Sequence, residues 1–281
     1  MIGDRLRLDG RTIVVAGAGG GGIGTAVCKA AAELGAQVVG LDIAETPLRD
    51  AEAVTTGAGG RFLGVRADVR VKDEVDAAMA DATKTFGTVD GLVHVVGGQQ
   101  PRHWQALDDF PMASLDEVLD VNLRSALLTS QAAAKEMIAS GRAGSIVHIS
   151  SVAGFVAAPF SAAYAVAKAG LMSLTRTMAV EWGRHGIRVN AVAPGTISTP
   201  HSRGNEAADA ERDAVLALKR RGTPEELAGA VMFVLSDLGG FVTGQTIVVD
   251  GGSTVRPSYL DVHDIPVFME DGELRRRLLQ P

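Results

Sequence analysis

The strongest constraint on the fold is a repeated alternation of short β-branched runs with alanine-rich stretches of helical pattern. The first run lies at residues 12–15, and a helical stretch at 25–34 follows it. Further runs lie at 37–41, 61–67, 91–96, 145–149, 187–192 and 246–249, with helical stretches at 74–86, 114–140, 162–183 and 225–236. Strands that alternate with helices of this length predict βαβ units. Because the runs are apolar throughout, we expect a parallel sheet covered on both faces.

The predicted fold class is therefore α/β. We expect a single doubly wound domain of the Rossmann type, with a mostly parallel sheet of about seven strands and helices on both faces. Such a sheet binds its ligand at the carboxyl ends of the strands. The domain is expected to span residues 1–252, and residues 253–281 to form a C-terminal extension.

Composition narrows the function classes. The chain has 281 residues, 46% of them apolar, and a net charge of −6. This mild acidity argues against nucleic acid as the main ligand, and no apolar run reaches the roughly 18 residues that cross a membrane. The first ten residues lack the apolar region of a secretory signal. The single cysteine, Cys28, excludes an internal disulfide or a cysteine-based zinc site, so we expect a cytoplasmic protein without a metal.

A glycine-rich loop follows the first predicted strand and precedes a helix. Glycines let the backbone turn sharply and approach a pyrophosphate, and the helix N-terminus presents free N–H groups to the anion. This context favours dinucleotide binding, although a plain glycine-rich turn or a methyltransferase-type loop has the same composition. The expected phosphate contacts are Gly17, Gly19, Gly21, Gly22, Ile23 and Gly24.

Acidic residues follow the second and third predicted strands. Asp42 lies where a carboxylate can bind both ribose hydroxyls of an adenosine and repel a 2′-phosphate. We therefore expect NAD as cofactor, with NADP less favoured; a solvated strand-end acid is the alternative. Asp68 is placed to meet the adenine edge, unless it is a simple turn aspartate. The remaining expected cofactor contacts in this region are Ile43, Val69, Val96 and Gly97.

A candidate acid/base set follows the fifth strand. Ser150 and Ser151 end that strand, and Tyr164 and Lys168 share one helix face four residues apart. A free tyrosine has a pKa of about 10, and a nearby ammonium would favour the phenolate and lower that value. The Ser151 hydroxyl can hold the substrate oxygen. Such a set moves a proton while a cofactor moves a hydride.

Over residues 8–252 the chain resembles the short-chain dehydrogenase/reductase family. The matching pieces stand in the family's order: the glycine loop, Asp42, Asp68, Val121-Asn122, Ser151, Tyr164-x-x-x-Lys168, Asn190, Pro194-Gly195 and Asp250-Gly251-Gly252. Each piece alone is weak evidence, whereas the ordered set is specific.

The resemblance implies a role for each matching position. Tyr164 would be the acid/base, Lys168 would lower its pKa and bind the nicotinamide ribose, and Ser151 would polarise the substrate. Asn122 would hold a water that links Lys168 to solvent. Pro194, Gly195, Ile197 and Thr199 would flank the nicotinamide amide, and residues 199–219 would form a lid. The resemblance also implies a homo-oligomer, a tetramer or a dimer, built on helices near Tyr164.

Two positions depart from the family pattern. Four residues instead of three follow Ala16-Gly17 before Gly-x-Gly, so we expect the loop to bulge. The usual Asn-Asn-Ala-Gly is His94-Val95-Val96-Gly97 here. We expect His94 to be a hydrogen-bonded core histidine rather than a ligand.

Two segments are expected to form the substrate walls. One is residues 98–112, with Gln99 and Trp104, and the other follows Ser151 and includes Phe155. Ser151 and Tyr164 would also contact the substrate. Mostly apolar walls suit a medium-sized organic molecule. The predicted function is NAD-dependent oxidation of a secondary alcohol or reduction of its ketone. An NADPH-dependent 3-oxoacyl thioester reductase and a non-catalytic NAD-binding protein are the alternatives.

Overall fold

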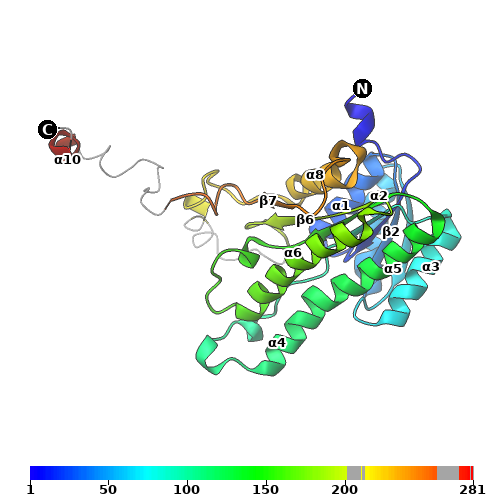
Figure 1. Ribbon diagram of the computed structural model, residues 1–281, viewed down its shortest axis with the longest axis horizontal. Helices are drawn as coiled ribbons and strands as arrows, with labels where there is room; N and C mark the ends of the chain where they lie inside the picture. The colour runs from blue at the N-terminus through cyan, green and yellow to red at the C-terminus, as the bar shows by residue number, and fades with distance from the viewer. Residues whose placement is uncertain (201–209, 211–212, 258–271, 279, 281) are drawn as a thin grey trace.

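The computed structural model describes residues 1–200, 210, 213–257, 272–278 and 280. Within them, seven parallel strands form one sheet in the order β3-β2-β1-β4-β5-β6-β7 (Figure 1). This order places the switch point between β1 and β4, where a doubly wound sheet binds its ligand. The strands are β1 (Thr12–Ala16), β2 (Gln37–Asp42), β3 (Arg61–Arg66), β4 (Gly91–His94), β5 (Gly144–Ile149), β6 (Ile187–Pro194) and β7 (Thr246–Val249).

Helices cover both faces of the sheet, as predicted (Figure 1). Alternate residues of β1 explain the two layers: Ile13 and Val15 pack into the core with α1 and α8, whereas Val14 and Ala16 pack into the core with α3 and α5. The helices are α1 (Ile23–Glu33), α2 (Glu45–Gly57), α3 (Lys72–Phe86), α4 (Met112–Leu119), α5 (Ser125–Ser140), α6 (Ala162–Gly183), α8 (Pro224–Leu235) and α10 (Gly272–Leu278).

The structure differs from the predicted elements in two places. Helix α2 was not predicted, and it buries only Leu48, Ala51 and Thr55, too few apolar positions for a clear period. The single helix predicted at 114–140 is interrupted by a π-helical turn at Asp120–Arg124, between α4 and α5. Such turns are frequent at functional sites, and this one contains Asn122.

Two predicted segments fall largely outside the described residues. Residues 201–209 and 211–212 belong to the predicted lid, and residues 258–271, 279 and 281 to the predicted extension. The domain boundary at residue 252 therefore stays a prediction, although the sheet itself ends at Val249. Within the part of the chain that the structure describes, no helix combines the length and the apolar character needed to span a membrane.

Candidate active site

The glycine loop is shaped so tightly that side chains are excluded at several positions. A Cβ atom on Gly24 would lie 1.8 Å from the carbonyl oxygen of Gly17, and one on Gly19 would lie 2.1 Å from the Cβ atom of Pro47. Gly20 and Gly21 both have positive φ angles, 82° and 67°, and these consecutive left-handed residues turn the lengthened loop. The loop leads directly into α1, so the free N–H groups of the helix face the space beside it.

A cleft of about 490 Å³ lies beside this loop, at the carboxyl ends of the strands. It gathers most of the predicted cofactor contacts: Gly17, Gly19, Gly22, Ile23, Gly24, Asp42, Ile43, Asp68, Val69, Val96, Gly97 and Thr199. Its lining also includes residues that were not predicted, namely Gly20, Ala67, Arg70, Val95 and Val121. Six predicted cofactor contacts are not part of its lining: Gly21, Tyr164, Lys168, Pro194, Gly195 and Ile197.

Asp42 lies at the end of β2 and faces the glycine loop. Its carboxylate accepts hydrogen bonds from the backbone N–H groups of Gly19 and Ala44, each at 3.3 Å. These bonds fix the carboxylate at the mouth of the cleft, next to the exposed side chain of Ile43. The contact of Asp42 with a ribose stays a prediction.

Asp68 is engaged by a residue that sequence reasoning missed. The Arg70 guanidinium donates to the Asp68 carboxylate from Nε at 2.9 Å and from Nη2 at 2.6 Å. This pair lowers the pKa of Asp68, chiefly through the side-chain hydrogen bond. Arg70 therefore brings a cation into the cleft. Its position two residues after Asp68 was the only feature of the sequence that could have predicted this pair.

Ser151, rather than Ser150, has its side chain next to Tyr164. The Ser150 hydroxyl is buried and donates to the Lys168 carbonyl oxygen at 3.1 Å. Ser151 begins a short 3-10 turn at Val152–Gly154, in which its hydroxyl accepts from the Ala153 N–H. The Ser151 side chain also interacts with that of Tyr164, and this interaction acts to lower the pKa of Tyr164. The end of β5 thus brings the predicted serine and tyrosine together.

Lys168 is a buried cation, with 2% of its surface exposed. Its Nζ atom donates to the Ile149 carbonyl oxygen at 2.9 Å and lies 5.5 Å from the centre of the Tyr164 ring. Burial lowers the pKa of Lys168 to about 8. Burial also raises the pKa of Tyr164, opposed by its interaction with Ser151. The expectation that Lys168 lowers the pKa of Tyr164 is therefore wrong for this structure, because burial of the tyrosine outweighs the other effects.

Asn122 connects the π-helical turn to the loop after β4. Its Oδ1 atom accepts from the Gly98 N–H at 2.7 Å, and its Nδ2 group donates to the Gly98 carbonyl at 2.8 Å. A Cβ atom on Gly97 would lie 2.7 Å from Asn122 Oδ1 and 2.8 Å from Lys168 Nζ. Gly97 therefore joins the cofactor cleft to the buried lysine. The proposed water on Asn122 stays a prediction.

The two strand histidines behind the site are core residues. His94 is fully buried, and its ring nitrogens hydrogen-bond the hydroxyls of Ser125 and Thr129 on α5. Burial lowers its pKa well below the usual value. The prediction of a hydrogen-bonded core histidine is confirmed. Within the described residues, no group of His, Cys, Asp and Glu side chains is arranged to hold a metal.

The predicted wall at residues 98–112 contacts the segment that lies between the second predicted wall and α6. The Gln99 side-chain amide donates to the Ser161 hydroxyl at 2.5 Å, and the Gln105 N–H donates to the Phe160 carbonyl at 3.0 Å. Trp104 and Phe155 are 58% and 47% exposed, so they lie at the outer rim of the walls rather than in a closed pocket.

Comparison with known proteins identifies relatives over most of the chain. A family model described as enoyl-(acyl carrier protein) reductase matches residues 17–254. The chain is 37% identical to 2-dehydro-3-deoxy-D-gluconate 5-dehydrogenase of Escherichia coli K12, over 91% of this chain and 100% of that protein. It is also 37% identical to an L-rhamnose 1-dehydrogenase (NAD(P)(+)) of a Sphingomonas species, over 88% of this chain and 98% of that protein.

A solved structure agrees with these relatives. The 7α-hydroxysteroid dehydrogenase complexed with NADH and 7-oxoglycochenodeoxycholic acid superposes with a TM-score of 0.82 at 33% sequence identity. The match covers 89% of this chain and 96% of that one.

Proposed function

The chain belongs to the short-chain dehydrogenase/reductase family and is an oxidoreductase acting on CH–OH groups, and we propose that it transfers a hydride between NAD and a secondary alcohol or its ketone, with Tyr164 as general acid/base. One observation carries the proposal. The buried amine of Lys168, 5.5 Å from the centre of the Tyr164 ring, lies next to Gly97, which also lines the cleft beside the glycine loop.

The residues of the chain divide the chemistry among them. The nicotinamide ring supplies the hydride acceptor or donor when the cofactor is bound. Tyr164 Oη takes the hydroxyl proton of the alcohol, or returns it to the ketone oxygen. The Ser151 hydroxyl holds the same oxygen by a hydrogen bond. The Lys168 ammonium stabilises the phenolate through its charge, and the low-dielectric surroundings that bury it strengthen this effect.

NAD is the proposed cofactor because of the charge at the ribose end of the cleft. The Asp42 carboxylate, fixed by the N–H groups of Gly19 and Ala44, would hydrogen-bond ribose hydroxyls and repel a 2′-phosphate. Arg70, the cation in the same cleft, is paired with Asp68. The glycine loop supports a dinucleotide, since its tight course depends on Gly17 and Gly24, where a Cβ atom would crowd neighbouring residues.

The direct test is an absorbance assay for NADH with a panel of secondary alcohols. The panel should contain ring alcohols, linear alcohols, sugar acids and 3-hydroxyacyl thioesters, each tried with NAD and with NADP. The proposal requires turnover of at least one alcohol with higher kcat/KM for NAD. Binding of NAD without turnover of any member would instead support a non-catalytic NAD-binding protein.

An acyl-chain reductase is the second candidate, because the matching family model is described as enoyl-(acyl carrier protein) reductase. This candidate predicts preferred binding of NADPH and reduction of a 3-oxoacyl thioester. Titration of the chain with NADH and with NADPH, followed by fluorescence, separates the two cofactors. Tighter binding of NADPH would favour the acyl-chain reductase over the NAD-dependent alcohol dehydrogenase.

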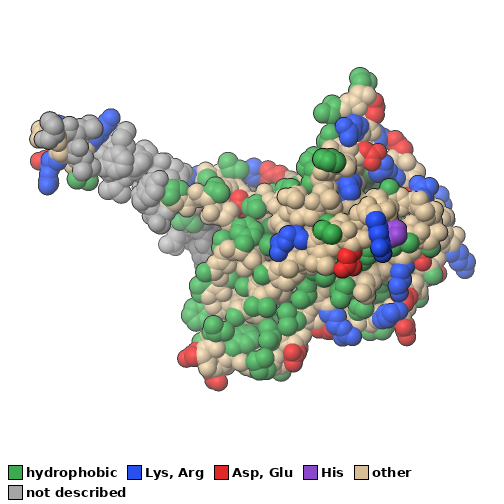
Figure 2. Space-filling model, in the orientation of Figure 1, with side chains coloured by type: hydrophobic (Ala, Val, Ile, Leu, Met, Phe, Trp, Pro, Cys, Tyr) green, Lys and Arg blue, Asp and Glu red, His purple; other side chains and the backbone are tan. Residues whose placement is uncertain are grey.

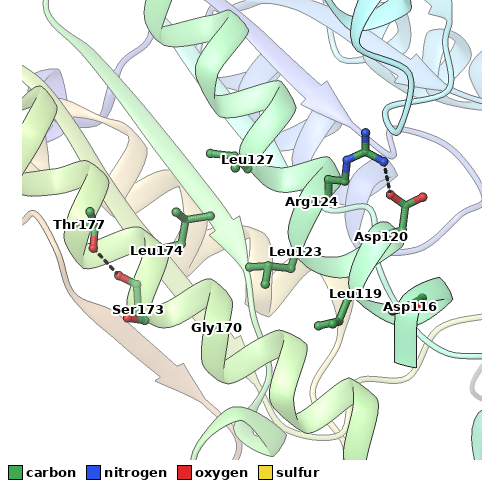
Figure 3. Close-up of a pocket in the computed structure, with 10 residues that line it drawn as sticks. All are labelled: Asp116, Leu119, Asp120, Leu123, Arg124, Leu127, Gly170, Ser173, Leu174 and Thr177. Atoms are coloured by element: carbon green, nitrogen blue, oxygen red, sulfur yellow. Dashed lines mark hydrogen bonds and ion pairs between the residues drawn. The ribbon is translucent and has the colours of Figure 1, made fainter. Parts of the chain in front are cut away.

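We also propose that the chain forms a homo-oligomer, a dimer or a tetramer, through the face that carries α6. A groove of about 640 Å³ lies between α6 and the segment from α4 to α5, and Leu123 and Leu174 point into it (Figure 3). Val166 and Val180 extend this apolar face along α6, 56% and 83% exposed. A second copy that presents the same face would cover it.

A further inference from the structure

We propose that Phe160 forms, with Trp104, a preset apolar entrance that selects alcohols with an uncharged ring or hydrocarbon body over polyhydroxylated acids. This inference rests on the proposed function, because it assigns the substrate class of the same site. Phe160 adopts a backbone conformation that folding alone does not favour.

Phe160 has a φ angle of +62°, a left-handed conformation that few bulky residues adopt. Such a conformation costs about 1–2 kcal/mol for an L-residue with a side chain. Glycine or asparagine would occupy the position with less strain. The Phe160 ring is also 63% exposed, so burial of the ring does not offset the backbone cost. Strain of this kind gathers at functional sites.

The position is fixed from both sides. The Phe160 carbonyl accepts the Gln105 N–H at 3.0 Å, next to Trp104 in the opposite wall. The following residue, Ser161, accepts the Gln99 side chain at 2.5 Å and donates its own N–H to the Ala158 carbonyl at 3.1 Å. The left-handed residue therefore lies where the wall at residues 98–112 is tied to the segment before α6, four residues before Tyr164.

One side of this junction is apolar. Residues 150–167, which run from the end of β5 to the buried turn of α6, contain no charged side chain. Phe155 and Val156 are 47% and 40% exposed. Figure 2 shows hydrophobic side chains gathered over α4 and the N-terminal end of α6. In the opposite wall, Arg102 is paired with Glu117 at 2.9 Å.

An apolar rim distinguishes between substrates because each of them must lose water from its surface to bind there. An uncharged ring packs on aromatic faces and releases water from both surfaces. A sugar acid would lose hydrogen bonds to water at the same rim, and unpaired polar groups are costly to bury. The rim therefore favours ring alcohols, and the aromatic ring of Phe160 contributes to binding rather than to the chemical step.

The test compares two alcohols in the wild-type enzyme and in Phe160→Asn. The probes are 4-tert-butylcyclohexanol and D-gluconate, each oxidised with NAD. We expect wild-type kcat/KM to favour the ring alcohol by about tenfold or more, the lower range for losing apolar contacts. Phe160→Asn should raise KM for the ring alcohol about tenfold and leave kcat unchanged. Its Tm should not fall, because asparagine tolerates the left-handed backbone. Phe160→Leu should keep the low KM.

Phe241→Asn is the matched control. Phe241 is fully exposed and precedes β7, at the sheet edge opposite the catalytic end, and its substitution should leave KM unchanged. A Tm loss in Phe160→Asn with a fall in kcat would indicate a merely structural role. An unchanged KM in Phe160→Asn, or a wild-type preference for gluconate, would overturn the inference and leave the proposed function intact. Turnover of neither probe also counts against the inference, whereas unimpaired turnover in Tyr164→Phe overturns the proposed function itself.

Discussion

At the scale of single residues, the site depends on a lysine that the fold buries beside a tyrosine. Lys168 has a backbone carbonyl, that of Ile149, as its hydrogen-bond acceptor. A carbonyl satisfies the amine without neutralising it, so the positive charge remains available to Tyr164. The same burial that makes this charge effective disfavours it in the folded chain.

Lys168→Met should therefore separate activity from stability. The pKa of Lys168 is about 8 in the folded chain and 10.5 in the unfolded chain. The free energy of unfolding therefore falls by about 3 kcal/mol as the pH drops from 10.5 to 8. Removing the amine removes that cost, and leaving the Ile149 carbonyl unpaired costs about 1–3 kcal/mol. We expect a Tm close to wild type and a kcat at least about 100-fold lower.

The control for that comparison is Lys135→Met, the same substitution at an exposed position of α5. It should change neither Tm nor kcat appreciably. A Lys168→Met enzyme with wild-type kcat would remove the lysine from the proposed chemistry.

Asp42 is expected to set the choice of cofactor. Asp42→Ala combined with Ile43→Arg removes a carboxylate and adds a guanidinium that can pair with a 2′-phosphate. The ratio of kcat/KM for NADP over NAD should rise at least about tenfold, measured with one alcohol. Asp42→Asn is the control, because it removes the charge and keeps one oxygen that can accept from Gly19 or from Ala44. An unchanged ratio in the double variant would refute the role of Asp42.

Single positions differed in how well the sequence predicted them. Ser151, Tyr164 and Lys168 were predictable because a strand end and a four-residue helical spacing determine where those side chains meet. Arg70 was missed because its role depends on where the turn after β3 brings its side chain. The direction of the Tyr164 pKa shift was not predictable either, since it depends on the depth of burial.

At the scale of elements, β5 positions the proposed catalytic side chains by connecting two helices. His148 hydrogen-bonds Ser130 of α5 and Thr175 of α6, both at 2.8 Å. The next two residues of the chain, Ile149 and Ser150, bond Lys168. His94 of β4 lies next to His148 and hydrogen-bonds Thr129 of α5. This buried polar layer holds the helices in register with the strand ends.

The layer should make the fold sensitive to acid. Burial lowers the pKa of His148 to about 3, below the unfolded value of 6.5. Its contribution to stability is therefore complete above pH 6.5 and is lost as pH falls toward 3, by up to about 1.4 kcal/mol per pH unit. Urea unfolding at pH 7, 6, 5 and 4 should show this slope. In His148→Asn the free energy of unfolding should depend less on pH, by up to about 1.4 kcal/mol per pH unit, the contribution of one proton. An equal pH dependence in wild type and variant would contradict the role assigned to His148.

Elements were predictable where their apolar period was strong. The strands and the long helices α3 and α6 were found because buried faces repeat along them. Helix α2 was missed because it lies on the sheet with few buried side chains. The π-helical turn at Asn122 inserts its extra residue without a change in composition, so the pattern at 114–140 suggested one continuous helix.

At the scale of the whole molecule, the doubly wound topology explains why residues distant in sequence form one site. All seven strands are parallel, so Asp42, Gly97 and Ser151 follow strands that end at the same edge. The fold class was predictable from the alternation of strands and helices alone. The assembly of the chain depends on a surface instead, and a single sequence does not show what covers it.

Ser173→Arg should test the proposed assembly. Ser173 lines the groove on α6 between Val166 and Val180, and a charged side chain there would oppose packing of a second copy. Sedimentation should show a wild-type dimer or tetramer and a variant shifted toward monomer. Thr56→Arg, an exposed position on α2, is the control and should assemble normally. A monomeric wild type, or an unchanged mass in Ser173→Arg, would contradict the proposal.

The central claim is that Tyr164 transfers the proton, and one measurement tests it most directly. It is the kcat of Tyr164→Phe on the best alcohol of the panel, taken together with the affinity of the same variant for NAD. The account predicts a kcat at least about 100-fold below wild type with unchanged NAD affinity. A Tyr164→Phe enzyme that binds NAD and turns over at the wild-type rate would contradict it.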